Sequence, residues 1–168
     1  EPVCRSVMSF FKSEGVSSVE VGPWAMERYL ADPSDCRFLQ SFKTFAASPS
    51  FHSTIIHGRS WRYEDLMAAF LESMLANCVP VLTKAPGRLV IGRPVIYAGH
   101  APDATLAQTR YLAALAQCGF KDVHFVYEPV AAAFYFAQQL ERDATILVAD
   151  FGGGTSDFSV VRFSLGKD

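Results

Sequence analysis

The chain has 168 residues, of which 50% are hydrophobic and 19% are charged. It is therefore long enough for a full core and too apolar to remain disordered. Its formal net charge of −2 supplies no basic field for nucleic acid or for an anionic membrane surface. No apolar run approaches the roughly 18 residues of a membrane-spanning helix, so we expect neither nucleic acid nor a membrane among the partners.

The four cysteines, like the four histidines, lack the spacing of a metal site or of a redox motif. Cys78 and Cys118 fall in helical patterns, where a small buried side chain is common. We expect these two, with Cys4 and Cys36, to be reduced thiols of a cytoplasmic protein, and none to be a nucleophile. The N-terminus has no signal-peptide pattern and does not begin with Met, so we interpret the sequence as a segment of a longer chain.

The first half of the chain predicts a hairpin followed by three helices. Residues 3–11 and 17–22 are rich in β-branched and aromatic residues around a turn-like KSEG sequence, and Pro23 fits the first turn of a short helix. Residues 34–50 mix polar and aromatic residues without a clear period. We interpret them only as a short helix running into a loop. A stronger helix begins near residue 64 and continues to Pro80. Its apolar face consists of Leu66, Met67, Phe70, Leu71, Met74, Leu75 and Cys78.

The second half alternates strands and helices. Residues 87–97 predict a strand that stops near Gly92, because Pro94 cannot sit in a central ladder. A helix closed by Gly119 follows, and then a strand, a helix and two strands over residues 121–127, 128–140, 144–151 and 156–163. This order predicts an α/β layered sheet with parallel pairs. The apolar run at 144–149 predicts a strand covered on both faces.

Three glycines flanked by two carboxylates lie between the last two predicted strands, in the sequence ADFGGGTSD. Glycines leave no Cβ to block a ligand, so their N–H groups can converge on a phosphate. Asp150 and Asp157 can hold hydrated Mg²⁺, which bridges to phosphate oxygens, and Thr155 can orient water. The pattern indicates a clamp for nucleotide phosphates and a metal, and an ordinary glycine-rich hairpin turn is the alternative. The glycines are Gly152, Gly153 and Gly154.

The DFG sequence at residues 150–152 also occurs in protein kinases. Those enzymes need an upstream G-x-G-x-x-G loop, a strand lysine and an H-R-D loop. None of these is present, so we exclude the protein kinases.

Glu128 begins a predicted helix, and Pro129 fits its first turn. The helix dipole favours a charged carboxylate at this end. Spacing alone is more typical of an ordinary first-turn acid, so a functional role depends on what lies opposite.

Two motifs together carry a family resemblance. YEPVAAAFYFA (127–137) and ILVADFGGGTSDFSVV (146–161) resemble the N-E-P-T-A-A-A helix and the D-L-G-G-G-T-x-D hairpin of the 70-kilodalton heat-shock (DnaK-type) chaperones, in the actin-like ATPase superfamily. The strings VIGRPV, GFKDVHFVYEP and SFKTF resemble the YegD-like chaperones, which carry R-P-V where DnaK has V-P-A.

The resemblance implies an α/β, actin-like ATPase (ribonuclease H-like) fold. Residues 1–140 would form most of the first lobe, and residues 141–168 would begin the second lobe with the second phosphate loop. The first phosphate loop and the adenosine-contact motif of the family have no match here, and we expect them to lie outside these residues.

The resemblance also implies Mg-ATP or Mg-ADP as the ligand and assigns roles to residues. Asp150 matches the acid near the metal and phosphates, residues 152–155 match the second phosphate loop, and Asp157 matches the acid that closes it. Glu128 matches the carboxylate that positions the attacking water. Lys43 matches the lysine that reaches the γ-phosphate.

The implied function is ATP hydrolysis that moves one lobe relative to the other, with Arg93 and Pro94 at a strand end that takes part in this movement. We expect activity from the full-length protein and none from these 168 residues alone. Unfolded peptide or a co-chaperone would bind through other regions. A non-catalytic actin-like scaffold is one alternative, and a small-molecule kinase, for which there is no substrate signature, is another.

Overall fold

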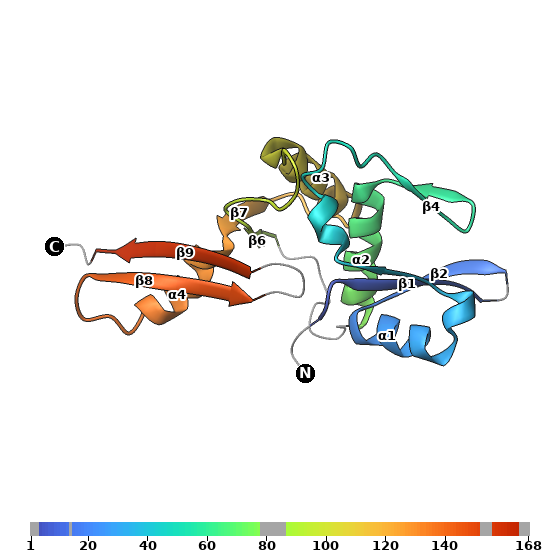
Figure 1. The fold of residues 1–168 in the computed structure, drawn as a ribbon, viewed down its shortest axis with the longest axis horizontal. Helices are drawn as coiled ribbons and strands as arrows, with labels where there is room; N and C mark the ends of the chain where they lie inside the picture. Colours follow the sequence, from blue (N-terminus) through green and yellow to red (C-terminus); the bar gives the residue numbers. More distant parts are fainter. Residues whose placement is uncertain (1–3, 14, 78–86, 152–155, 165–168) are drawn as a thin grey trace. The chain divides into compact units, whose positions relative to one another are not determined.

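In the computed structural model, residues 4–13, 15–77, 87–151 and 156–164 are described, and they form two compact units (Figure 1). The first unit comprises residues 1–87 and 98–121, and the second comprises residues 88–97 and 122–168. These units are not the lobes expected from the sequence, so the lobe boundary after residue 140 stays a prediction.

The first unit contains a three-stranded antiparallel sheet in the order β2-β1-β3. The hairpin of β1 (Val7–Ser13) and β2 (Val16–Val21) confirms the sequence prediction, as does helix α1 (Gly22–Ala31) with a proline in its first turn. The helix expected in residues 34–50 is replaced by strand β3 (Arg37–Gln40) between two 3₁₀ turns. Four residues are too few to show a strand period in the sequence.

The 3₁₀ turns are η1 (Pro33–Asp35) and η2 (Phe42–Phe45). A short hairpin of β4 (Thr54–Ile56) and β5 (Arg59–Trp61), which the sequence did not predict, leads into α2 (Tyr63–Asn77). Helix α2 packs against α3 (Ala104–Gln117), as Figure 1 shows. The core lies between these helices and the sheet, and its most buried side chains include Met8, Phe10, Val21, Tyr63, Leu66 and Leu115.

The second unit begins with a parallel pair of strands, β6 (Leu89–Arg93) and β7 (Val123–Tyr127). Strand β6 ends just before Pro94, as the sequence predicts. Helix α4 (Glu128–Ala137) follows β7 directly and packs on the antiparallel hairpin of β8 (Ala144–Phe151) and β9 (Ser156–Phe163). Among the described residues, no helix is long and apolar enough to cross a bilayer.

The prediction that β8 is covered on both faces is wrong for the described residues. Burial alternates along the strand, and Leu147 is 66% exposed. Phe151, Phe158 and Val160 are exposed on the same hairpin. A continuous apolar run indicates that both faces can be covered, but it does not identify the segment that covers them. In this chain α4 covers one face only.

Cys118, the C-cap residue of α3, is half-buried, and its Sγ donates to the carbonyl oxygen of Ala68 at 3.7 Å. Burial, together with the charge of Glu72, raises the pKa of the Cys118 thiol to about 11. Free cysteines of this kind pack as small hydrophobes, which agrees with the expectation that Cys118 is not a nucleophile.

We expect Cys118 to react with iodoacetamide far more slowly than the exposed Cys4 at pH 8, because the thiolate is the reactive form. The rate at Cys118 should rise about tenfold per pH unit until the pH approaches the thiol pKa. Mass spectrometry of the labelled peptides measures both sites in one sample. Equal rates at pH 8 would contradict the assigned burial.

Candidate functional site

The hairpin of β8 and β9 places two carboxylates directly opposite each other. In the antiparallel register Asp150 pairs with Asp157, next to the end pair of Phe151 and Ser156. Opposite residues on such a pair have their Cβ atoms about 4.5–5.5 Å apart and project from the same face. The two acids predicted from the sequence therefore lie together at the turn end of the hairpin.

The face that carries these acids is the one that α4 covers. Val148 and Ser159 form the next pair along this face and are half-buried, whereas Asp150 and Asp157 are exposed. The apolar cover therefore ends just before the two carboxylates. They lie at the edge of a packed surface, where both residues are exposed to solvent.

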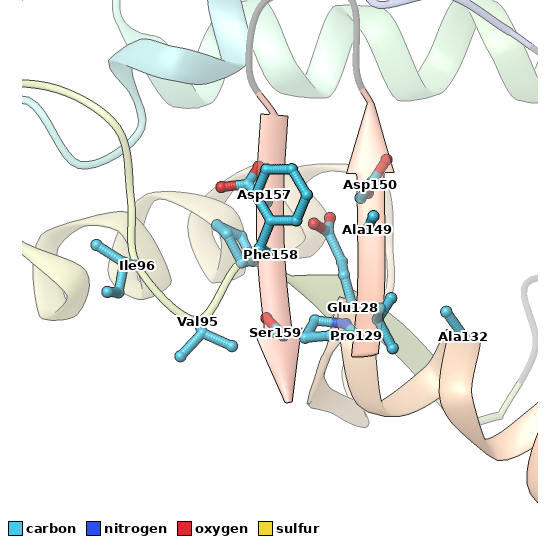
Figure 2. Close-up of a pocket in the computed structure, with 12 residues that line it drawn as sticks. Val95, Ile96, Glu128, Pro129, Ala132, Ala149, Asp150, Asp157, Phe158 and Ser159 are labelled. Atoms are coloured by element: carbon cyan, nitrogen blue, oxygen red, sulfur yellow. The ribbon is translucent and has the colours of Figure 1, made fainter. Parts of the chain in front are cut away.

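Glu128 joins this site from the first turn of α4. Its side chain lines the same pocket of about 390 Å³ as the two aspartates, and in Figure 2 its carboxylate points toward the turn end of the hairpin. Ala132 also lines the pocket, and Ala133 is buried. The volume is within the range of about 300–1,000 Å³ that is typical of small-molecule sites. The pocket residues are Pro94, Val95, Ile96, Glu128, Pro129, Ala132, Val148, Ala149, Asp150, Asp157, Phe158 and Ser159.

Gly92 makes room for the stem of Glu128. A Cβ placed on Gly92 would lie 3.0 Å from Cγ of Glu128 and 3.8 Å from its Oε1. The approach follows from the parallel register, which pairs Gly92 with Val126 and Arg93 with Tyr127, the residue before Glu128. A glycine inside a strand often marks such a close approach, but the sequence alone did not connect Gly92 with Glu128.

Arg93 lies beside the start of α4. Its guanidinium carbon is 5.0 Å from the ring centroid of Tyr127 and 5.8 Å from that of Tyr97, within the range of a cation–π interaction. Burial raises the pKa of Tyr97, with an opposing effect of Arg93 and a further increase from Glu128. The end of β6 thus contacts both Tyr127 and Glu128.

Two other groups of residues that the sequence predicts for the site are not among the described residues that line this pocket. Gly152, Gly153, Gly154 and Thr155 lie outside the described residues. Lys43 is exposed on η2 in the first unit, so its place in a shared site stays a prediction.

The oxygen ligands of the pocket suit a hard, hydrated cation. Within the described part of the chain, no group of three or more His, Cys, Asp or Glu side chains is arranged to hold a metal ion directly. Two carboxylates in register repel each other, and a cation that keeps most of its waters would relieve this repulsion without a full protein cage. Mg²⁺ is bound in this way, through one or two carboxylates and the phosphates of its substrate.

Comparison with known proteins identifies the family. The family profile described as Hsp70 protein matches residues 46–167, which is more than half of the chain, so the chain belongs to the Hsp70 family. The resemblance to DnaK-type chaperones is thereby confirmed, and the α/β fold is that of the actin-like ATPase domain. The YegD-like branch stays a prediction.

Two similar proteins are DnaK chaperones of cyanobacteria. Chaperone protein DnaK 3 of Synechococcus sp. is 27% identical over 163 residues, covering 94% of this chain and 24% of that protein. Chaperone protein dnaK1 of Synechocystis sp. is 25% identical over 167 residues, covering 96% of this chain and 23% of that protein. The chain therefore spans about a quarter of the length of these relatives.

We expect Gly92→Ala to displace the Glu128 side chain while the strand remains intact. The backbone of Gly92 is not left-handed, so alanine is sterically allowed there except for its contact with Glu128 Cγ. A crystal structure of the variant should show a changed Glu128 rotamer. Gly87→Ala is the matched control, because its Cβ would meet no described atom within 4 Å. An unmoved Glu128 in Gly92→Ala would contradict the assigned contact.

Proposed function

We propose that the full-length protein is a chaperone-type ATPase and that the pocket of the second unit binds the phosphates of Mg-ATP. One observation carries this proposal: Asp150 and Asp157 are paired in register at the turn end of the hairpin, and Glu128 lines the same pocket. Membership of the Hsp70 family supports nucleotide as the ligand.

In this proposal Asp150 and Asp157 would hold Mg²⁺ through water, and the ion would supply positive charge to the phosphates. The Glu128 carboxylate accepts a hydrogen bond from a water molecule and orients it for in-line attack on the γ-phosphorus. The chain supplies no covalent nucleophile, so catalysis depends on position and on electrostatic stabilisation. Glu128 therefore has to be held in one orientation, and Gly92 leaves the room that its stem occupies.

The remaining assignments rest on the family resemblance. The N–H groups of Gly152 to Gly154 and the hydroxyl of Thr155 would contact phosphate oxygens. The ammonium group of Lys43 would meet the γ-phosphate and stabilise the charge that develops there.

In this proposal, ATP hydrolysis shifts the equilibrium between two positions of the lobes, because ATP and ADP make different contacts with them. We place the protein in the YegD-like branch and in the cytoplasm on the sequence patterns described above. Unfolded peptide or a co-chaperone would bind regions outside these residues.

Calorimetry of Mg-ATP binding to the full-length protein tests the site. We expect Asp150→Ala to weaken binding by about 10- to 100-fold, which is the usual effect of removing a group that holds a metal through its outer shell. Glu141→Ala is the control, because it removes an exposed carboxylate that lies outside the pocket. Equal affinity of Asp150→Ala and the unmodified protein would overturn the proposed phosphate site.

Phosphate release by the same proteins tests catalysis separately. Glu128→Gln should keep Mg-ATP affinity and release phosphate about 10²- to 10⁴-fold more slowly, because the amide is a poor acceptor for the water proton. Binding by the unmodified protein without any phosphate release would favour the nucleotide-controlled scaffold.

A further inference from the structure

Arg110, on α3, binds four backbone carbonyl groups of one loop. Its Nη1 donates to the carbonyl oxygens of Phe45, Ala46 and Ser48 at 3.0, 2.9 and 3.0 Å, and its Nη2 donates to that of Phe51. The guanidinium also lies over the ring of Tyr63, with 5.8 Å from its carbon to the ring centroid. One side chain thus joins a loop that is about 60 residues away in the sequence to α3 and α2.

The loop held by Arg110 continues directly from the turn that carries Lys43. The N–H of Ala46 donates to the carbonyl oxygen of Lys43 at 3.1 Å, so η2 ends at the first residues bound by Arg110. A second backbone contact, from the N–H of Asp103 to the carbonyl oxygen of Ala47 at 2.8 Å, fastens the same loop to the start of α3. The C-terminal side of the turn is therefore fixed to α3.

The N-terminal side of the turn is fixed to α2. Phe42 is 3% exposed, and its ring centroid lies 5.5 Å from that of Phe70 and 6.4 Å from that of Tyr63. Lys43 itself is exposed. Its backbone is thus held between a buried phenylalanine and a loop bound by Arg110, and its side chain is left to solvent.

We propose that Arg110 is a positioning residue for Lys43. It fixes the backbone on the C-terminal side of Lys43, so that the ammonium group is presented in one direction before substrate binds. This inference rests on the proposed function, in which Lys43 meets the γ-phosphate. The guanidinium group of Arg110 donates its hydrogen bonds to neutral carbonyl groups of the loop. Arg110 therefore acts on the reaction through Lys43 and has no contact with the substrate.

The guanidinium group is suited to this task because its donors form a rigid planar fork. A lysine at position 110 would keep the charge, but it would offer three donors from one nitrogen and could not reach carbonyl groups on both sides of the fork. Arg110→Lys therefore separates the effect of geometry from that of charge, and Arg110→Gln removes both.

Hydrogen exchange of the full-length protein tests the structural half of the proposal. Amides of residues 42–51 should exchange faster in Arg110→Lys and in Arg110→Gln, whereas amides in the middle of α3 stay protected. Gln108→Ala, an exposed change on the same helix, is the control and should alter neither segment. Unchanged protection of residues 42–51 in both Arg110 variants would overturn the proposal.

Single-turnover hydrolysis tests the functional half. Lys43→Ala and Arg110→Lys should each lower the rate of phosphate release by about 10- to 100-fold, as expected for misplaced reacting groups, with little change in Mg-ATP affinity. The double variant should be no slower than Lys43→Ala, because both changes remove the same contribution. A multiplicative loss in the double variant, or full activity in Arg110→Lys, would overturn the proposal.

The same series separates failure of this inference from failure of the proposed function. If Asp150→Ala lowers Mg-ATP affinity but Lys43→Ala leaves the hydrolysis rate unchanged, the phosphate site stands and the role of Arg110 in positioning Lys43 is wrong. If the unmodified protein binds no Mg-ATP, the proposed function fails, and the role of Arg110 in the reaction fails with it.

Discussion

The parallel pairing of β6 with β7 is the constraint on which the candidate site depends. Its register places Gly92 beside the residue two positions before Glu128, and α4 begins at Glu128 without a connecting loop. The direction in which α4 leaves the sheet, and hence its position over the β8–β9 hairpin, follows from this pairing. A change of one residue in the register would turn every side chain of β7 to the opposite face and would take Glu128 out of the pocket.

The paired aspartates of the candidate site are a local cost to the stability of the hairpin. Like charges directly opposite on neighbouring strands destabilise a hairpin, and Asp150 and Asp157 occur where the cover of α4 ends. Exposure to water reduces their repulsion, because the effective dielectric is high there. Nearer the middle of the hairpin the same pair would be buried beside Val148 and would cost far more. The turn end is therefore the place where this face can carry two carboxylates.

Sequence patterns identified the larger elements and the acids of the site, because these signals are local. The bounds of β8 and β9 follow from two apolar runs separated by glycines, and the end of β6 follows from Pro94. Strands of three or four residues, such as β3 and β4, are too short to show a period. The roles of Gly92 and Arg110 could not be predicted, because each depends on a partner far away in the sequence: Glu128 for Gly92, and the carbonyl groups of residues 45–51 for Arg110.

Gly92 and Arg110 illustrate how residues elsewhere in the chain shape the surroundings of an exposed charged group. In the proposed function the Glu128 carboxylate and the Lys43 ammonium group have to meet a substrate, and such groups are positioned by packing and by a supporting shell of contacts. Gly92 leaves room for the stem of Glu128, where a Cβ would lie 3.0 Å from Cγ, and Arg110 binds backbone carbonyl groups that follow Lys43. Gly92 and Glu128 both belong to the second unit, and Arg110 and the loop that it binds both belong to the first unit. Organisation of this kind lowers the entropy that substrate binding would otherwise have to overcome.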